Sequence, residues 1–311
     1  MSITLKQLRH FVAATETGQV SRAAERCFVS QPTLTTSLKN LETALGSALF
    51  TRHPDGLRLT PRGDGFLRYA NEALSTVAAG IDAARRLPDQ VAGSVRLAIT
   101  DTISGYLLPW LISAMRRELP AVRLELEERN RDEIEVGLRR RGHDMAIVLV
   151  SNLSRAKDIG RETLVRSPRQ LWTAMHHPLA AKSRITLADV AACDYVLLDM
   201  DEHVETVREY WSRHRLQPKT VFSSKSIEAV RSLVAQNVGV TILSDLVYRP
   251  WSHDGGRIQR KPLADAVPSM DLGLALLRGD TLSPAAQALR KLIRRSAKAL
   301  SGDGMQGREP D

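Results

Sequence analysis

Residues 21–46 read SRAAERCFVSQPTLTTSLKNLETALG, and this stretch decides the fold of the first part of the chain. It predicts two helices, the first behind an N-cap at Ser21 and the second behind an N-cap at Ser30. Pro32 falls in the first turn of the second helix, where its missing N–H costs nothing, and Gly46 is placed to end that helix. The buried stripe of this helix consists of four leucines at helical spacing, Leu34, Leu38, Leu41 and Leu45. The pattern is typical of a helix–turn–helix unit whose second helix keeps a polar face.

The flanking residues extend this unit at both ends. Apolar residues from Leu5 onward follow helical spacing until Gly18, which ends a first helix. Behind the second helix of the unit, two short apolar runs at 48–50 and 57–59 enclose a Pro-Asp-Gly turn, which predicts the hairpin of a wing. A helical pattern over residues 61–87 follows, and it is too long for the small unit before it to bury. We therefore expect this helix to pack against a copy of itself.

The charge of the first 62 residues favours a polyanionic partner. They hold eight basic and four acidic residues, so +4 of the formal net charge of +9 lies there. The polar helix face offers amide, hydroxyl and ammonium groups, which suit the base edges and phosphates of a DNA major groove. We predict base contacts from Gln31, Thr33 and Thr36. The other residues predicted to contact DNA, mainly at phosphates and sugars, are Ser30, Pro32, Thr35, Lys39, Arg52 and Arg58.

Beyond residue 90 the pattern changes to an alternation of strands and helices. Strands are predicted at 95–99, 122–126, 144–149, 195–198 and 240–243. Helices are predicted at 106–118, 131–141, 204–215, 226–236 and about 284–300. This alternation favours a mostly parallel, doubly wound α/β architecture, so the fold class is α/β behind an all-α N-terminal unit. The polar residues 301–311 are expected to form a disordered tail.

Composition excludes several other classes of protein. Hydrophobic residues make up 43% and charged residues 25% of the 311 residues, as in a globular chain of two or three domains. The two cysteines, Cys27 and Cys193, are too few for a secreted disulfide framework. No apolar run approaches the ~18–20 residues of a membrane span, and the N-terminus has no apolar run of signal-peptide length. We therefore expect a cytoplasmic protein.

The residues from Ala23 to Gly63 match a known signature without a gap. The matching positions include Ser30-Gln-Pro-Thr-Leu-Thr35, Leu41-Glu42, Leu45-Gly46, Leu49-Phe-Thr-Arg52 and Leu59-Thr60. This stretch resembles the N-terminal signature of LysR-type transcriptional regulators, and looser resemblance continues at Leu107-Leu-Pro109 and His177-Pro-Leu-Ala180. The resemblance implies a winged helix–turn–helix DNA-binding domain at 1–60, a dimerising linker helix at 61–89 and an effector-binding domain at 90–300. That domain is expected to have a periplasmic-binding-protein fold, with lobe 1 at about 90–163 and 268–300 and lobe 2 at about 164–267.

The resemblance also implies partners for the chain. These are double-stranded DNA, a small-molecule effector bound between two lobes, RNA polymerase, and further copies of the chain in a homotetramer built as a dimer of dimers. Two positions depart from the family pattern. Asp55 stands at the wing tip, where the family usually has a basic residue, and this moves the expected phosphate contact to Arg52 or Arg58. Ser244 follows the strand at 240–243, where Pro is common in the family.

Polar residues behind the predicted strands mark the expected effector site. In open α/β sheets, ligands bind beyond the carboxyl ends of strands and beside helix N-termini. Thr100 and Thr102 stand two apart behind the first strand, so in extended geometry their side chains point the same way. The complete set of predicted effector-binding residues is Thr100, Asp101, Thr102, Ser104, Leu149, Asp199, Asp201 and Ser226.

The charges of this set suggest what the effector carries. Carboxylates at Asp101, Asp199 and Asp201 disfavour a polyanion. Free backbone N–H groups and Lys225 favour a single carboxylate, and an amphoteric or amine-bearing small molecule fits both features.

Three alternatives have little support in the sequence. An enzyme is disfavoured because no Gly-x-Ser-x-Gly elbow and no metal-ligand spacing occur, so we expect no catalytic residue, no metal site and no cofactor. A thiol-based redox sensor would depend on Cys27, which fills an apolar helix position, or on Cys193, which has no resolving partner nearby. A protein that binds DNA but no effector is disfavoured because about 200 residues of α/β sequence would then have no evident function.

Overall fold

Three short helices and a hairpin form the N-terminal unit. The computed structural model describes residues 3–84, 91–154, 156–200 and 203–301. The helices are α1 (Leu5–Thr17), α2 (Val20–Arg26) and α3 (Gln31–Leu45). Phe11 of α1 centres their core, with its ring 5.3 Å from the ring of Phe50 and 5.4 Å from that of Phe66. Aromatic rings at such distances stabilise each other beyond their buried area.

Helix ends in this unit follow the sequence pattern, with one exception. Gly18 ends α1 and Gly46 ends α3 in left-handed conformations, with φ of 64° and 63°. Ser30 caps α3 and Pro32 lies in its first turn, as predicted. The prediction of Ser21 as an N-cap is wrong, because α2 begins at Val20 behind the N-cap Gln19, two residues earlier than predicted.

The wing contacts the C-terminal end of α1 through its backbone. Its strands β1 (Phe50–His53) and β2 (Gly56–Leu59) pair antiparallel. Gly56 has φ of 132° and lies so close to the Gly18 carbonyl that a Cβ would overlap it. The next amide, of Leu57, donates a hydrogen bond of 2.7 Å to that same carbonyl oxygen. Only glycine permits this approach, and it fixes the wing relative to α1.

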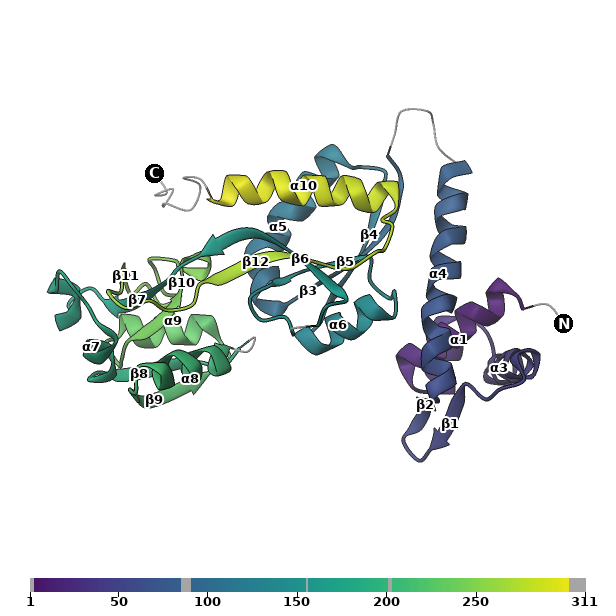
Figure 1. Ribbon diagram of the computed structural model, residues 1–311, viewed down its shortest axis with the longest axis horizontal. Coiled ribbons are helices and arrows are strands. Elements are labelled where there is room, and N and C mark those ends of the chain that lie inside the picture. Colours follow the sequence, from purple (N-terminus) through teal and green to yellow (C-terminus); the bar gives the residue numbers. More distant parts are fainter. Residues whose placement is uncertain (1–2, 85–90, 155, 201–202, 302–311) are drawn as a thin grey trace.

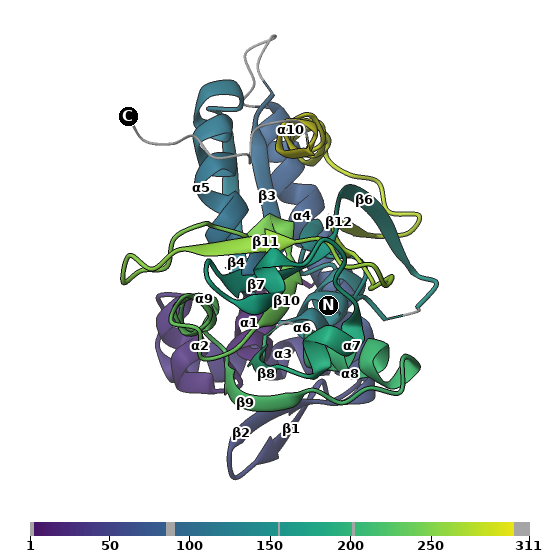
Figure 2. The same cartoon turned by 90° about the vertical axis from the view of Figure 1, so that its left-hand side faces the viewer.

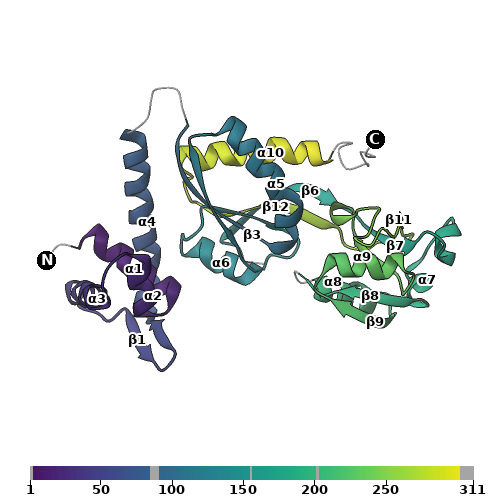
Figure 3. The ribbon, with the colours of Figure 1, turned by 180° about the vertical axis from the view of Figure 1, so that it is seen from behind.

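A long helix and lobe 1 lie side by side behind this unit. Helix α4 (Pro61–Ala84) spans 24 residues and stands alongside lobe 1 in Figures 1 and 3. Lobe 1 contains one sheet in the order β4-β3-β5-β12-β6. Its strands are β3 (Gly93–Ile99), β4 (Val122–Glu128), β5 (Met145–Leu149), β6 (Ile159–Ser167) and β12 (Met270–Leu277). Its helices are α5 (Asp101–Glu118), α6 (Arg131–Arg139) and α10 (Pro284–Ser301).

Lobe 2 lies beyond lobe 1, farthest from α4 (Figure 1). Its three-stranded sheet has the order β10-β7-β11, and a second sheet pairs β8 with β9. The strands are β7 (Arg169–Ala174), β8 (Asp194–Leu198), β9 (Lys219–Ser224), β10 (Thr241–Ser244) and β11 (Ile258–Lys261). The helices are α7 (Leu187–Ala191), α8 (His203–Arg213) and α9 (Ile227–Ala235), with short 3₁₀ turns η1 (Pro178–Ala181) and η2 (Asp245–Val247). Both α8 and α9 pack against β8 (Figure 2).

Two strands tie the lobes together. Strand β6 leads through Pro168 directly into β7, and β12 brings the chain back from lobe 2 to pair with β6 over its whole length. One hydrophobic core accordingly includes Leu97 and Ile103 of lobe 1 with Trp172 and Val230 of lobe 2. The expectation of a mostly parallel sheet holds for strand direction in lobe 1, where β3, β4, β5 and β6 all run the same way. The exception is β12, which pairs antiparallel with β5 and β6, and in lobe 2 β7 pairs antiparallel with β10 and β11. The returning strand was not visible in the strand–helix alternation.

The predicted tail and the end of the predicted linker helix lie outside the described residues. These are residues 302–311 and 85–89.

Candidate DNA interface and effector site

The polar face of α3 lies on the surface. Of the nine predicted DNA contacts, Thr35 is half-buried and the other eight are exposed. The Ser30 hydroxyl accepts from the amide of Thr33 at 3.3 Å and lies 2.7 Å from the Thr33 hydroxyl. The Thr35 hydroxyl donates to the carbonyl of Gln31 at 2.9 Å. The start of α3 is therefore held in one geometry before any ligand arrives, which favours recognition.

A shallow groove runs between the start of α1 and α3. It has a volume of about 490 Å³, and Lys6 and Gln7 of α1 line it together with Thr33 and Thr36 of α3. Lys6 is exposed and adds a cation beside the two threonines. Lys6 was not among the predicted DNA contacts, although its position in the first turn of a helix that packs on α3 favours such a contact.

The two wing arginines differ in their surroundings. Arg58 of β2 lies 3.7 Å from the carboxylate of Asp55 at the tip, so part of its charge is compensated. Arg52 of β1 is exposed and forms no ion pair with any residue that the structure describes. Arg52 is thus the wing cation available to a phosphate.

Helix α5 begins earlier than the sequence pattern indicated. It starts at Asp101 behind the extended residue Thr100, whereas the prediction placed its start near Tyr106. Thr102 therefore lies in the first helical turn, and the expectation that Thr100 and Thr102 point the same way from an extended segment is wrong. Thr100 is buried, makes no side-chain capping bond, and its hydroxyl has no hydrogen-bond partner.

A small cavity lies between lobe 1 and lobe 2, and we call it the inter-lobe cavity. It holds about 20 Å³, which is room for about one water molecule. Its polar lining comes from Thr102 of α5, Asn152 behind β5, Arg169 of β7, His203 of α8 and Ser244 of β10. The cavity thus gathers polar groups from both lobes at the point where β6 passes into β7.

Only two of the predicted effector residues line this cavity, Thr102 and Leu149. Asp101, Asp199 and Ser226 are exposed, and Ser104 is half-buried. Ser226 caps α9 by accepting from Ala229 N at 3.2 Å, and Ser104 donates to the carbonyl of Asp101 at 3.3 Å. Asp201 lies outside the described residues.

Arg169 and His203 are the two ionisable residues that the sequence analysis missed. They are 5% and 7% exposed. Burial lowers the pKa of Arg169, and burial together with the charge of Arg169 lowers the pKa of His203 to about 3. His203 is therefore neutral at pH 7. The sequence around Arg169, Arg166-Ser-Pro-Arg169-Gln-Leu-Trp172, holds no local signal that distinguishes a buried arginine from an exposed one.

Comparisons with known proteins agree with this geometry. The family model described as "LysR substrate binding domain" matches residues 88–298. The chain belongs to the LysR family. A second family model, "Bacterial regulatory helix-turn-helix protein, lysR family", matches residues 5–64. This LysR-family chain is a DNA-binding transcriptional regulator with an effector-binding domain, and it is not an enzyme.

Relatives and solved structures cover nearly the whole LysR-family chain. IlvR of Caulobacter vibrioides, named an HTH-type transcriptional regulator, is 30% identical over 302 residues, which cover 95% of this chain and 99% of that protein. Full-length OxyR C199D from Pseudomonas aeruginosa is 29% identical with a TM-score of 0.71, over 94% of this chain and 98% of that one. HinK from the same organism, a LysR family regulator, is 28% identical with a TM-score of 0.62, over 96% and 100% of the two chains.

The cysteines of this LysR-family regulator lie in unreactive surroundings. Cys27 ends α2 in the N-terminal unit, and Cys193 precedes β8 in lobe 2. Burial raises the pKa of both thiols, the opposite of what a reactive thiolate needs. The Cys193 thiol donates to the carbonyl of Asp189 at 3.4 Å.

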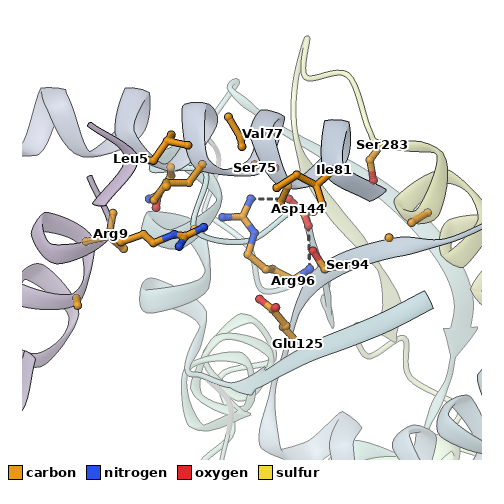
Figure 4. A pocket seen from close by; sticks show the side chains of 18 of the residues that line it. Leu5, Arg9, Ser75, Val77, Ile81, Ser94, Arg96, Glu125, Asp144 and Ser283 are labelled. Atoms are coloured by element: carbon orange, nitrogen blue, oxygen red, sulfur yellow. Dashed lines mark hydrogen bonds and ion pairs between the residues drawn. The ribbon is translucent and has the colours of Figure 1, made fainter. Parts of the chain in front are cut away.

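The linker helix α4 and lobe 1 of the regulator are in direct contact. Asn71 of α4 donates to the carbonyl of Arg140 at 2.9 Å, and the Arg140 guanidinium pairs with Asp64. Beside this contact lies an interdomain cavity of about 570 Å³ between α1, α4 and lobe 1. Figure 4 shows Arg9 of α1 reaching into it toward the ion pair of Arg96 and Asp144, whose N···O distance is 2.7 Å. A displacement of lobe 1 therefore changes the surroundings of α1 and α4.

Membrane-spanning helices and metal-binding clusters are absent from the described residues. None of their helices combines the length and apolar character that a membrane span requires. Their His, Cys, Asp and Glu side chains form no group of three suited to a metal ion.

Proposed function

We propose that α3 reads the major groove of a two-fold related DNA site, one half-site for each subunit of a dimer. The observation that carries this is the exposed, pre-shaped polar face of α3, with Arg52 of the wing beside it. In this proposal Gln31, Thr33 and Thr36 contact base edges. The phosphates and sugars are contacted by six further residues and by Lys6 of α1. The six are Ser30, Pro32, Thr35, Lys39, Arg52 and Arg58.

The linker helix α4 pairs the subunits, and the effector domains pair two such dimers into a tetramer. The ring of Tyr69 on α4 supports this, since it stays 58% exposed in the single chain. The proposed divisions are 1–60, 61–89 and 90–300, with lobes at about 90–163 and 268–300, and at about 164–267. Because the regulator acts on chromosomal DNA, its working partners include RNA polymerase and its compartment is the cytoplasm.

The effector binds between the lobes and changes how the DNA-binding units are set. This coupling requires an effector with different affinities for two arrangements of the chain. The direct contacts between lobe 1 and α4 support such a route, because they join the effector domain to the linker helix that follows the DNA-binding unit.

The test is selection of duplex DNA from a random library by the full-length protein. Enrichment of a motif with two-fold related half-sites is expected, since a dimer presents two α3 helices. Recovery of unselected sequence, or of a motif without symmetry, contradicts the proposal. The same assay with a Gln31→Ala, Thr33→Ala, Thr36→Ala triple variant is expected to lose the motif and to keep salt-sensitive binding to random duplex.

A further inference from the structure

Arg169 is a buried cation with an unused side of its guanidinium group. Its Nη1 donates to the carbonyl oxygens of Pro268 and Ser269, the latter at 3.0 Å. Its Nε is fully buried without a hydrogen-bond partner, and Nη2 has none among the described residues. Nε and Nη2 form the edge of the fork that holds a carboxylate through two parallel hydrogen bonds.

No carboxylate of the described chain forms an ion pair with Arg169. Asp271 is the carboxylate that influences Arg169, but it accepts from the Ser269 hydroxyl at 2.6 Å and lies 3.4 Å from Arg166. Asp245 is held by Arg260 at 2.9 Å and by Gln170 at 2.6 Å. A buried guanidinium without a counter-charge is costly for folding, so its retention in the inter-lobe cavity points to an anion that arrives from outside.

Two further groups in the same cavity suit an anion. His203 lines the cavity with a buried Nε2 that has no hydrogen-bond partner. Thr102 lies in the first turn of α5, an 18-residue helix, where amide N–H groups and the helix dipole favour negative charge. Arg169, His203 and the start of α5 come from three elements and meet at one cavity.

Apart from Asn152 and Ser244, the rest of the lining is apolar. Its side chains come from both lobes and include Leu149, Leu198, Met200, Ile227, Leu243 and Met270. The exposed carboxylates of Asp101 and Asp199 lie outside the lining, so no carboxylate among the described residues that line the cavity complements an amine. A ligand held here meets a cationic fork at one end and hydrocarbon around its body.

We propose that the effector is a monocarboxylic acid with an apolar body, whose carboxylate binds Nε and Nη2 of Arg169, with His203 and the start of α5 beside it. This rests on the proposed inter-lobe effector site and adds its chemistry. The space of about 20 Å³ is smaller than such a molecule, so the lobes must part to admit it. The lobes part by motion about the β6–β7 and β11–β12 connections, since these connections join them.

The experiment screens matched pairs of small acids and their amides against the full-length protein. The acids are C4–C10 aliphatic and aryl-alkyl monocarboxylates at up to about 10 mM, and the readout is the thermal unfolding midpoint, followed by calorimetric titration of each hit. Acids are expected to stabilise the protein, and the matching amides are not. Arg169→Gln is expected to weaken binding of each acid hit by about tenfold to a hundredfold.

Two variants separate lost binding from lost folding. Arg169→Lys keeps the charge but has no fork, so it is expected to fold and still to bind the acids at least tenfold more weakly. Arg208→Gln is the matched control, because Arg208 is exposed on α8 outside the lining of the cavity, and it is expected to bind like the parent.

The outcomes that reject the proposal differ from those that reject the proposed function. Hits among amides or amines, or acid hits that Arg169→Gln and Arg169→Lys bind unchanged, overturn the carboxylate assignment and leave an inter-lobe effector in place. Absence of any acid hit also overturns it. If no compound of any class shifts the thermal unfolding midpoint in an additional screen of neutral and cationic metabolites, the proposed inter-lobe effector site is rejected as well.

Discussion

Arg141, at the turn behind α6, lies with its Nη1 2.5 Å from Oε1 of Glu72 on α4. Its Nη2 lies 3.2 Å from Asp280, so one guanidinium joins α4 to two segments of lobe 1. The ion pair between Arg140 and Asp64 lies beside it. These pairs are partly exposed, so each stabilises folding only slightly, by about 0–1 kcal/mol. Their larger effect is on the arrangement of the domains.

Reversing one charge at this contact should open it. Glu72→Lys places a cation against Arg141, and we expect the radius of gyration of the protein in X-ray scattering to increase. Arg141→Glu combined with Glu72→Lys restores an opposite-charge pair and should restore the parent value. A double variant as open as the single one would show that the ion pair does not hold the domains.

Thr33→Ala should reduce sequence discrimination. Loss of its hydroxyl and methyl contacts is expected to cost about 1–3 kcal/mol at one base position in each half-site, with random DNA bound as before. The measurement is fluorescence anisotropy with the selected site and its single-base variants. Thr43→Ala is the matched control, since Thr43 is exposed near the opposite end of α3 and should bind like the parent.

Arg52→Ala should weaken binding to selected and random duplex alike. We expect the slope of log K against log salt to become shallower by about one unit, because one phosphate contact is lost. Arg58→Ala should change the slope less, because Asp55 already compensates part of the Arg58 charge. Equal slopes for Arg52→Ala and the parent would exclude Arg52 as a phosphate contact.

Thr100→Val should stabilise the unliganded protein. Its hydroxyl is buried and unpaired, and it forms no capping bond, so removing it relieves a desolvated polar group at a gain of about 1 kcal/mol. Urea unfolding followed by circular dichroism measures the change. Thr60→Val is the contrasting variant, since the Thr60 hydroxyl donates to Ala48 O at 2.9 Å and accepts from Gly63 N at 3.0 Å. It should destabilise the protein.

His203 should make the protein acid-sensitive. Its pKa is about 3 in the folded chain and about 6.5 when unfolded, so between these values the unfolded state binds more protons. The stability is therefore complete above about pH 6.5 and falls as the pH is lowered toward 3, by about 2 kcal/mol at pH 5 from this group. His203→Gln should show a smaller loss in urea unfolding between pH 7 and pH 5. An unchanged loss would place the acid sensitivity elsewhere.

Residues that begin and end helices explain which parts of the fold were predictable. Ser30, Pro32 and Gly46 set the ends of α3 locally, and the structure confirms them. Thr100 to Gly105 was read as a loop because polar residues there follow a strand, whereas tertiary packing continues α5 back to Asp101. Strand β12 escaped notice because its partners, β5 and β6, lie more than a hundred residues earlier in the chain.

The candidate effector site was less predictable than the DNA interface. Exposed residues on one helix face can be inferred from spacing alone, and this sufficed for α3. The inter-lobe cavity depends instead on which side chains β7 and α8 bury, and burial of a charged group has no local pattern. Arg169 and His203 became visible only when both lobes were in place.

The order of strands in lobe 1 also governs how the chain is made. Strand β12 lies between β5 and β6, so β5 lacks its partner on that side and β6 has no partner in the sheet until residues 270–277 have left the ribosome. Every strand of lobe 2 is synthesised before then, which lets lobe 2 form while β3, β4 and β5 still expose an apolar edge. Lobe 1 is thus the last part to close although its synthesis begins first, and the nascent regulator is most exposed to aggregation and to chaperone binding during that interval.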